Sequence, residues 1–410
     1  MPTSQKKWTV MVYLAGDNNL DANGVADLKE MKTVGTTEDV NVIAQFDRAA
    51  AGVQTTRYCL RKGTSTEADA VESIGETNTG SPEGLIDFIT WGVKNYPADH
   101  YALVLWNHGQ GWDDTDIYAG ERGAGARLGR PRRIRHALFK TSVVKAAKLT
   151  AQGGKVTRAI LLDDNAKDFL DNLELKQVVA EANHLISHKL DILGMDACLM
   201  NMAEVAYQVR DSVQYTIGSE QTEPLDGWPY DTILQALSAK PDMAPSALCE
   251  LIVKYYLASY RGSNEAVTQS AMDLANTTAF AGAWKAMVSA LKAGLKNSAT
   301  RAAIVNARNQ VQEYEVADNV DLIDLCRLLK AAAVPSTIKN ACDRVVKAVE
   351  GSQGLVLASG YSGTPMKGSH GVAIYFPTRN VSPLYANLDF TKKTGWGTFL
   401  KQYLLNTRGR

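Results

Sequence analysis

Cysteine is scarce in this chain of 410 residues, and the five that occur lie far apart. Cys59, Cys198, Cys249, Cys326 and Cys342 form no C-x-x-C pair, and their number is odd. The pattern excludes a zinc knuckle and a disulfide framework, the two usual uses of clustered cysteines. Each thiol must therefore be considered on its own.

A net charge is also missing, because 44 Lys and Arg balance 44 Asp and Glu. The whole chain thus lacks the basic field that attracts nucleic acid or an anionic membrane surface. The N-terminal apolar run, 8–16, is too short to span a bilayer, and no signal cleavage site follows it. We expect no nucleic-acid or membrane partner, and a cytoplasmic location unless a leader has been removed.

The sequence does contain a series of short apolar runs, each bounded by Gly, Asn or Asp. They lie at 8–16, 40–47, 100–109, 158–164, 190–198 and 214–220. Nearly continuous hydrophobicity indicates strands that are buried on both faces, as in a parallel sheet covered by helices. Helical candidates at 20–34, 81–95 and 167–187 alternate with these runs. The alternation predicts an α/β fold with a mostly parallel sheet.

The last third of the chain mixes helical segments with two more strand-like runs, 266–274 and 371–377. The expected helices cover 244–260, 277–295, 299–314, 320–332 and 336–350. No repeat or low-complexity linker separates this part from the rest. We therefore predict an α/β core over residues 1–235 and a largely helical C-terminal region over 236–410, packed on the same core.

Two residues with catalytic chemistry follow strand-like runs: His108 in LVLWNHGQGW (103–112) and Cys198 in LDILGMDACLM (190–200). Sites in open α/β sheets collect at the carboxyl ends of strands. Histidine can move a proton near neutral pH, and we expect a helix N-terminus to lower the pKa of the thiol. Together they would form a Cys-His dyad for acyl transfer, with the backbone N–H groups of Gly109 and Cys198 stabilising the oxyanion.

Each of these residues also has a plain structural interpretation. A histidine after an apolar strand is more often structural than catalytic, and a single buried cysteine commonly acts as a small hydrophobic side chain. Taken singly, neither residue decides between structure and catalysis.

The flanking segments carry a resemblance to a known family. WTVMVYLAGDNNLD (8–21), ALVLWNHGQGW (102–112), LDILGMDACLMNMAEVAY (190–207) and YTIGSEQTEPLDGWPYD (215–231) resemble the clostripain-like cysteine peptidases of family C11, clan CD. GVAIYFP (371–377) and WGTFLKQYL (396–404) match more loosely. The order of the two motifs, histidine before cysteine, is more specific than either motif alone. The resemblance implies a caspase-like sheet sandwiched by helices.

The resemblance also implies roles for individual residues. His108 would be the general base and acid, and Cys198 the nucleophile. Asp196 would lie at the base of the pocket for the residue before the cleaved bond and pair with Arg or Lys of the substrate. Asp226 is a second candidate for that pocket. The structural alternatives are a backbone cap for Asp196 and an Asp-Gly turn for Asp226.

A basic segment separates the two catalytic candidates. Residues 122–162 contain eleven Lys or Arg and no Asp or Glu, and the segment opens with many Gly and Pro residues. Such a segment is expected to be exposed, and clostripain-like enzymes are typically cut here into associated light and heavy chains. We expect self-processing of a zymogen within an insertion at about 113–158. The candidate cleavage residues are Arg127, Arg130, Arg133, Arg135, Lys140 and Lys148. The alternatives are a surface excursion without function and, less favoured because aromatic residues are few, a nucleic-acid arm.

Two acidic segments could have other uses. DDNAKDFLDN (163–172) could bind Ca²⁺, a cation often associated with this family, although it lacks the spacing of an EF-hand. A helix N-terminus with favourable charge explains it better. GDNNLD (16–21) is interpreted mainly as a helix start. The chemistry itself requires no cofactor, and Ca²⁺ would be a structural or activating ion.

The sequence therefore predicts an Arg- or Lys-directed cysteine endopeptidase, monomeric or composed of two associated fragments, that acts on peptides or proteins. Two other classes stay open: a peptidase-fold binding protein without activity, and a Cys-His hydrolase of another acyl substrate.

Overall fold

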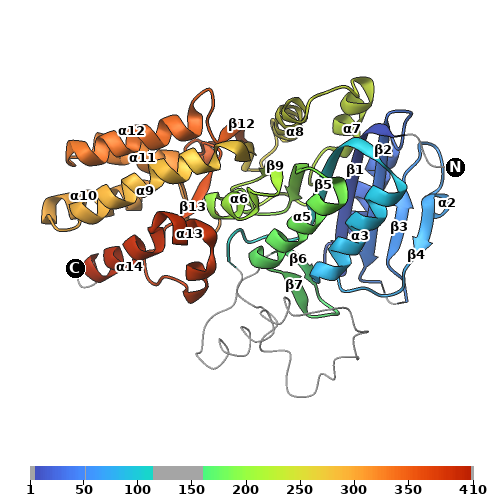
Figure 1. Ribbon diagram of the computed structural model, residues 1–410, viewed down its shortest axis with the longest axis horizontal. Helices are drawn as coiled ribbons and strands as arrows, with labels where there is room; N and C mark the ends of the chain where they lie inside the picture. Colours follow the sequence, from blue (N-terminus) through green and yellow to red (C-terminus); the bar gives the residue numbers. More distant parts are fainter. Residues whose placement is uncertain (1–4, 51, 114–159, 408–410) are drawn as a thin grey trace, which may run out of the picture.

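The computed structural model describes residues 5–50, 52–113 and 160–407. Its centre is a nine-stranded sheet in the order β12-β10-β9-β8-β5-β1-β2-β3-β4 (Figure 1). From one edge to the other the strands are β12 (Val356–Ser362), β10 (Val267–Asp273), β9 (Val213–Gly218), β8 (Leu190–Asp196), β5 (Ala98–Trp106), β1 (Lys6–Gly16), β2 (Val40–Arg48), β3 (Thr56–Cys59) and β4 (Ala70–Ser73).

The middle of this sheet is parallel and its edges are antiparallel. β9, β8, β5, β1 and β2 run in the same direction, whereas the outer pairs on both sides are antiparallel. β1 is buried from Trp8 to Gly16, and β5 from Tyr101 to Trp106. Strands buried on both faces need cover from both sides, which the helices provide. The predicted α/β fold class is confirmed.

Alternate residues of the central strands enter two separate hydrophobic cores. Met11 and Tyr13 point into the core formed with α3 (Pro82–Asn95), α5 (Asn172–Ile186) and α6 (Ala203–Val209). Val10 and Val12 point into the core formed with α1 (Asp21–Lys32), α7 (Tyr230–Ala239) and α8 (Pro245–Ser259). This alternation is the period of two that any strand imposes on its side chains.

The C-terminal region is largely helical, as expected, and forms the end of the molecule drawn in yellow to red in Figure 1. Its core is continuous with the core under α3, α5 and α6. The helices are α9 (Thr277–Gly294), α10 (Ser298–Gln310), α11 (Leu322–Ala331), α12 (Ser336–Glu350), α13 (Asp389–Thr394) and α14 (Trp396–Thr407). A short sheet of β11 (Asn319–Asp321) and β13 (Ala373–Tyr375) lies among them. The remaining short elements are α2 (Thr66–Asp69) and the 3₁₀ turns Leu274–Asn276, Thr364–Met366 and Pro383–Asn387.

Two expectations about residues 158–187 are wrong. The run at 158–164 does not join the central sheet, because β6 (Ile160–Asp163) pairs with β7 (Asp168–Leu170) in a separate antiparallel hairpin. The helix expected from 167 begins only at Asn172. Asp171 caps it: its side chain accepts hydrogen bonds from the backbone N–H groups of Leu173 and Glu174, and the Glu174 side chain accepts one from the Asp171 backbone N–H.

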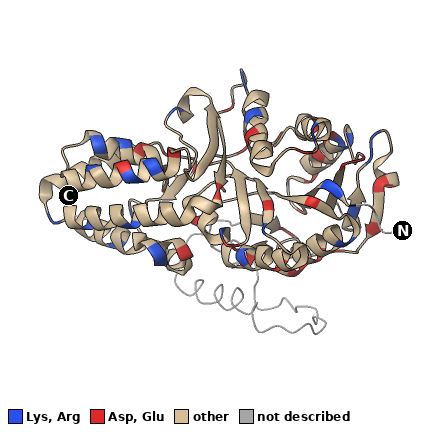
Figure 2. Cartoon of the chain, turned by 45° about the horizontal axis from the view of Figure 1, so that its top comes forward, with Lys and Arg blue, Asp and Glu red and all other residues tan. Residues whose placement is uncertain are grey.

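Acidic and basic residues are interspersed over the described helices and strands (Figure 2). Among these helices none is both long and apolar enough to cross a bilayer. The basic segment with its six candidate cleavage residues, from Arg127 to Lys148, lies outside the described residues.

Candidate active site

The two catalytic candidates follow the neighbouring parallel strands β5 and β8. Trp106, the last residue of β5, is in register with Asp196, the last residue of β8. His108 and Cys198 each come two residues later, so the parallel pairing brings them to the same edge of the sheet. His108, Asp196 and Cys198 all line one cavity of about 250 Å³. The other lining residues are Leu20, Trp106, Asn107, Ala197, Thr222, Glu223, Pro224, Leu225 and Gly227.

His108 is held by the turn that follows the first strand. Its Nε2 lies 2.7 Å from Oδ1 of Asn19. An amide oxygen can only accept, so in this contact the imidazole donates from Nε2 to Asn19. The His108 backbone N–H donates to Oδ1 of Asn107, whose Nδ2 donates to the carbonyl of Leu162 at 3.0 Å. The imidazole is thus oriented by two asparagines from two different segments.

Cys198 lies in the turn between β8 and α6, and its thiol is half-buried. The Glu223 backbone N–H donates to Sγ at 3.3 Å. Burial raises the pKa of the Cys198 thiol; the Glu223 N–H opposes this effect and the Asp196 carboxylate adds to it. The expected lowering of the thiol pKa by a helix N-terminus is therefore wrong. α6 has only seven residues and begins at Ala203, so its dipole lies too far along the chain to dominate.

Asp196 lines the cavity and is 5% exposed. Its Oδ2 accepts hydrogen bonds from the Tyr230 hydroxyl at 2.8 Å and from the Trp228 backbone at 3.4 Å. Burial nevertheless raises the pKa of this carboxyl. Gly227, with φ of 55°, lies so close that a Cβ there would come within 3.1 Å of Asp196 Oδ2. Glycine is therefore favoured at this position by both backbone conformation and space.

Asp226 does not share this position. Its side chain is exposed, and it is absent from the residues that line the cavity, whereas Glu223, on the same loop, is present. Our sequence interpretation singled out Asp226 and missed Glu223. Nothing in the segment YTIGSEQTEPLDGWPYD distinguishes Glu223 from its acidic neighbours, because the contact of its backbone with the thiol forms only in the folded chain.

Gly109 packs directly against the turn of the nucleophile. A Cβ on it would collide with the Cys198 carbonyl and come within 3.0 Å of the Ala197 side chain. Gly109 also forms an isolated antiparallel bridge with Ile160. The absence of a side chain thus lets the histidine segment lie against the cysteine segment.

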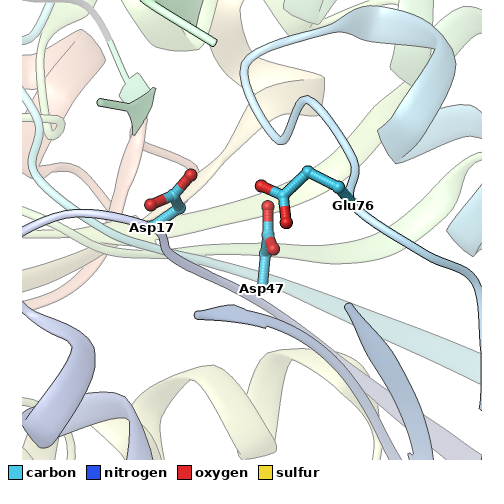
Figure 3. Close-up of side chains that lie close together, drawn as sticks. All are labelled: Asp17, Asp47 and Glu76. Atoms are coloured by element: carbon cyan, nitrogen blue, oxygen red, sulfur yellow. The ribbon is translucent and has the colours of Figure 1, made fainter. Parts of the chain in front are cut away.

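A second group of acids lies at the ends of β1 and β2. Asp17, Asp47 and Glu76 each offer an oxygen, and these oxygens lie within 4.8 Å of one another (Figure 3). Thr55 Oγ1 donates to Asp47 at 2.7 Å, and Asn165 Nδ2 donates to Asp17 Oδ1 at 2.9 Å. Burial raises the pKa of both Asp17 and Asp47 to about 7. We call Asp17, Asp47 and Glu76 the acidic cluster; its oxygen ligands suit a hard cation such as Ca²⁺.

The segment 163–172, considered above for Ca²⁺, has mainly structural contacts. Asp163 accepts from the Thr79 and Ala166 backbones at 3.0 and 2.7 Å, and Asp171 caps α5. Asp163 also acts electrostatically on Asp17, so this segment borders the acidic cluster.

Comparison with known proteins identifies the family. The sequence model of the clostripain family, Peptidase C11, matches residues 12–125 and 145–403. The chain belongs to the clostripain family. Clostripain of Hathewaya histolytica is 28% identical to this clostripain-family chain over 260 residues, which are 57% of this chain and 43% of that relative. The match therefore spans less than half the length of the relative.

Two solved structures share the fold of this clostripain-family chain. A secreted C11 cysteine protease from Bacteroides thetaiotaomicron, in complex with an irreversible peptide inhibitor, has a TM-score of 0.64 at 19% identity, covering 97% of this chain and 99% of that one. An inactive zymogen C11 protease from Parabacteroides distasonis has a TM-score of 0.65 at 21% identity, covering 96% and 99%. At these identities the likeness establishes the fold, which is the caspase-like arrangement of C11 peptidases.

Proposed function

We propose that the protein is a cysteine endopeptidase that hydrolyses peptide bonds after Arg or Lys. One observation carries the proposal: a histidine, a cysteine and a buried carboxylate, contributed by the ends of two adjacent strands, line a single cavity. Membership of the clostripain family supports the same chemistry.

In the proposed reaction, Cys198 Sγ attacks the carbonyl carbon of the scissile bond while His108 takes the thiol proton. The thiol pKa is raised by burial, so we expect a neutral thiol before substrate binds and proton transfer during the attack. The negative charge moves to the carbonyl oxygen, which the backbone N–H groups of Gly109 and Cys198 stabilise.

Collapse of this intermediate breaks the C–N bond, and His108 gives its proton to the leaving amine. Water then attacks the thioester, His108 accepts a proton from the water, and the acid product leaves as the thiol is restored.

The substrate preference follows from Asp196. A cationic side chain entering the cavity would meet a carboxylate that has little water around it, where charge-assisted hydrogen bonds are strong. Asp226 keeps a place only at the rim, because its side chain is exposed.

We also propose self-processing within the basic insertion. The segment joins β5 to β6, so a cut there leaves His108 on one fragment and Cys198 on the other. β5 and β8 remain paired in the sheet, which supports fragments that stay associated. A structural relative is itself described as an inactive zymogen, which supports a latent single-chain form.

Calcium is proposed as a structural ion at the acidic cluster. All three ligand groups are carboxylates, and Asp17 Oδ2 is buried without a hydrogen-bond partner among the described residues. The cluster borders the turn that carries Asn19, so an ion there would steady the support of His108. No step of the reaction passes through the ion.

Reporter peptides that differ only in the residue before the cleaved bond test the proposed function. We expect hydrolysis after Arg or Lys, none after Asp, and none by the Cys198→Ala protein. A binding protein without activity would cleave none of them. A hydrolase of another acyl substrate would leave the peptides intact, while an arginine-directed thiol inhibitor would fail to label Cys198.

A further inference from the structure

Glu223 lies on the loop after β9, between the nucleophile and Asp196. Its backbone N–H bonds to Cys198 Sγ, so its position relative to the nucleophile is fixed. Both of its side-chain oxygens are buried, and neither makes a well-formed hydrogen bond within the described residues, although the Asp196 carboxyl and the Trp228 indole lie close enough to act on them. A carboxylate can accept several hydrogen bonds, and burying it without them is unfavourable. Glu223 therefore brings unused acceptors to the cavity that Asp196 also lines.

The described groups that act most strongly on Glu223 are acidic or neutral. Asp196 and Cys198 both disfavour a negative charge on Glu223, while the Trp228 indole favours it. The groups that act most strongly on Asp196, Glu223 and Asp27 include no Lys or Arg side chain of the described residues. The titratable groups around the pair are Asp27 and Glu30 from α1, Asp226 from the same loop, Tyr230 from α7, Tyr256 from α8, Tyr260 just after α8, Glu315 beside the thiol, and His108, which lines the same cavity.

The carboxyls of Asp196 and Glu223 are buried and act on each other, so both cannot ionise without a positive charge nearby. Burial, followed by the charge of Asp196, raises the pKa of Glu223 well above its ordinary value. The pair therefore shares a proton while the cavity is empty, as coupled carboxyls do in other sites. A guanidinium or ammonium group would replace that proton.

We infer that Glu223, rather than Asp226, is the second carboxylate of the recognition pocket, and that Asp196 and Glu223 together bind the cationic side chain before the cleaved bond. The inference rests on the proposed function and names the group that sets its specificity. A guanidinium presents five N–H donors in a planar fork and can serve two carboxylates at once, whereas an ammonium is a compact point charge. The pair therefore favours Arg over Lys.

The first test compares Glu223→Gln with Asp226→Asn, two changes that each remove one charge from the same loop. The readout is the ratio of kcat/KM for a reporter with Arg to that for the same peptide with citrulline, which has the same shape without the charge. We expect Glu223→Gln to lower this ratio at least about thirtyfold, as loss of a buried partner does. Asp226→Asn is expected to change it less than about threefold, because exposed charge pairs contribute little. Glu223→Asp keeps the charge and should retain most of the ratio.

The second test does not need peptidase activity. Butylguanidine, which carries the cationic group alone, should protect Cys198 from alkylation by iodoacetamide, with the modified residue identified by peptide mass mapping. Protection of the wild type should strengthen as pH rises, because binding releases the shared proton. Glu223→Gln should bind more weakly and lose most of this pH dependence. Protection is measured against each variant's own unprotected alkylation rate, because the charge of Glu223 and the thiol act on each other.

The outcomes separate the inference from the proposed function. If Glu223→Gln keeps the Arg to citrulline ratio, or if Asp226→Asn loses it, the assignment of Glu223 is wrong even though the enzyme is an Arg-directed peptidase. If the wild type cleaves no reporter while butylguanidine still protects Cys198 in a Glu223-dependent way, the pocket is correct and the peptidase proposal fails. A changed alkylation rate without butylguanidine in both Glu223 variants would assign Glu223 to the support of the thiol instead.

Discussion

His108 and Cys198 line one cavity, but different regions of the chain hold them, and the acids of these regions are arranged differently. On the histidine side, Asp47 and Asp17 accept hydrogen bonds from Thr55 and Asn165, and neither acid is among the residues that line the cavity. On the cysteine side, Glu223 lines the cavity itself, and its carboxylate makes no well-formed hydrogen bond among the described residues, although the Trp228 indole lies near enough to favour its charge. Burial alone therefore does not identify a recognition site. What distinguishes the cysteine side is that its acceptors are left open to the cavity.

The largest expected effect sets the scale for both regions. Cys198→Ala should lower kcat/KM on an Arg reporter at least about a hundredfold. The change removes the nucleophile, and with it the thiol proton that His108 accepts. The protein should stay folded, with an unchanged circular dichroism spectrum.

On standing, the wild type should be converted into two fragments cut within 122–158, and Cys198→Ala should remain one chain. Measurement of intact mass after equal incubation checks this. Cutting of both proteins at equal rates would assign the cleavage to a contaminating protease.

The preference for Arg over citrulline should depend on acids of the cysteine side only. Asp196→Asn should weaken cleavage after Arg by about 2–5 kcal/mol, at least about thirtyfold, because it removes a buried partner of the guanidinium. Asp47→Asn, the matched change on the histidine side, should leave the Arg to citrulline ratio within about threefold. Steady-state kinetics on the two reporters measure both. An equal loss of the Arg to citrulline ratio in the two variants would show that acids on both sides recognise the cationic side chain.

A smaller effect is expected from the support of the histidine. Asn19→Ala removes the partner of Nε2, and loss of one hydrogen bond is typically worth about 1 kcal/mol, or about fivefold. Because Asn19 acts on His108 and not on the pocket, the Arg and citrulline reporters should slow by the same factor. A loss confined to the Arg reporter would place Asn19 in the recognition pocket instead.

The smallest effect concerns stability and the acidic cluster. The pKa values of Asp17 and Asp47 are raised to about 7, whereas an unfolded Asp titrates near 3.9. The folded state therefore binds more protons between these values, so stability should fall as pH rises from about 4 to 7. In a chelator, Tm should be a few degrees higher at pH 5.5 than at pH 8.

At pH 8, calcium should restore part of the lost stability, because its positive charge would balance the ionised carboxylates of the acidic cluster. Asp47→Asn should show a smaller calcium shift and a flatter pH profile. The profile should not become level, because Asp27, Glu204 and Glu220 also have raised pKa values and act in the same direction. A wild type whose Tm is indifferent to calcium would remove the ion from the proposal.

The sequence predicted most of the central strands because they are buried on both faces, which leaves a nearly continuous apolar signal. β4 has no such signal, since all of its residues from Ala70 to Ser73 are exposed. The hairpin of β6 and β7 carries the same apolar signature as a central strand, so its separate pairing could not be distinguished from sequence. Hydrophobic periodicity describes only neighbouring residues, so it can neither detect an exposed edge strand nor show which strands pair.

Within the site, His108 and Cys198 were accessible to sequence reasoning because glycines and strand ends mark them. Glu223 and Asn19 were not, since each acts through a contact with a residue far away in the chain. The pKa of the thiol was predicted with the wrong sign because burial outweighs the field of a short and distant helix. Burial of a loop residue is a tertiary property that no local pattern records.

The register of β5 on β8 also has a consequence for how the protein folds. The pairing of Trp106 with Asp196 closes a long loop, and such contacts form slowly because the chain must lose much of its freedom before they form. His108 and Cys198 can meet only after that step. A partly folded chain that has its first strands and helices therefore contains both reactive groups but no dyad. We expect nucleophilic reactivity to appear late in refolding, together with the centre of the sheet.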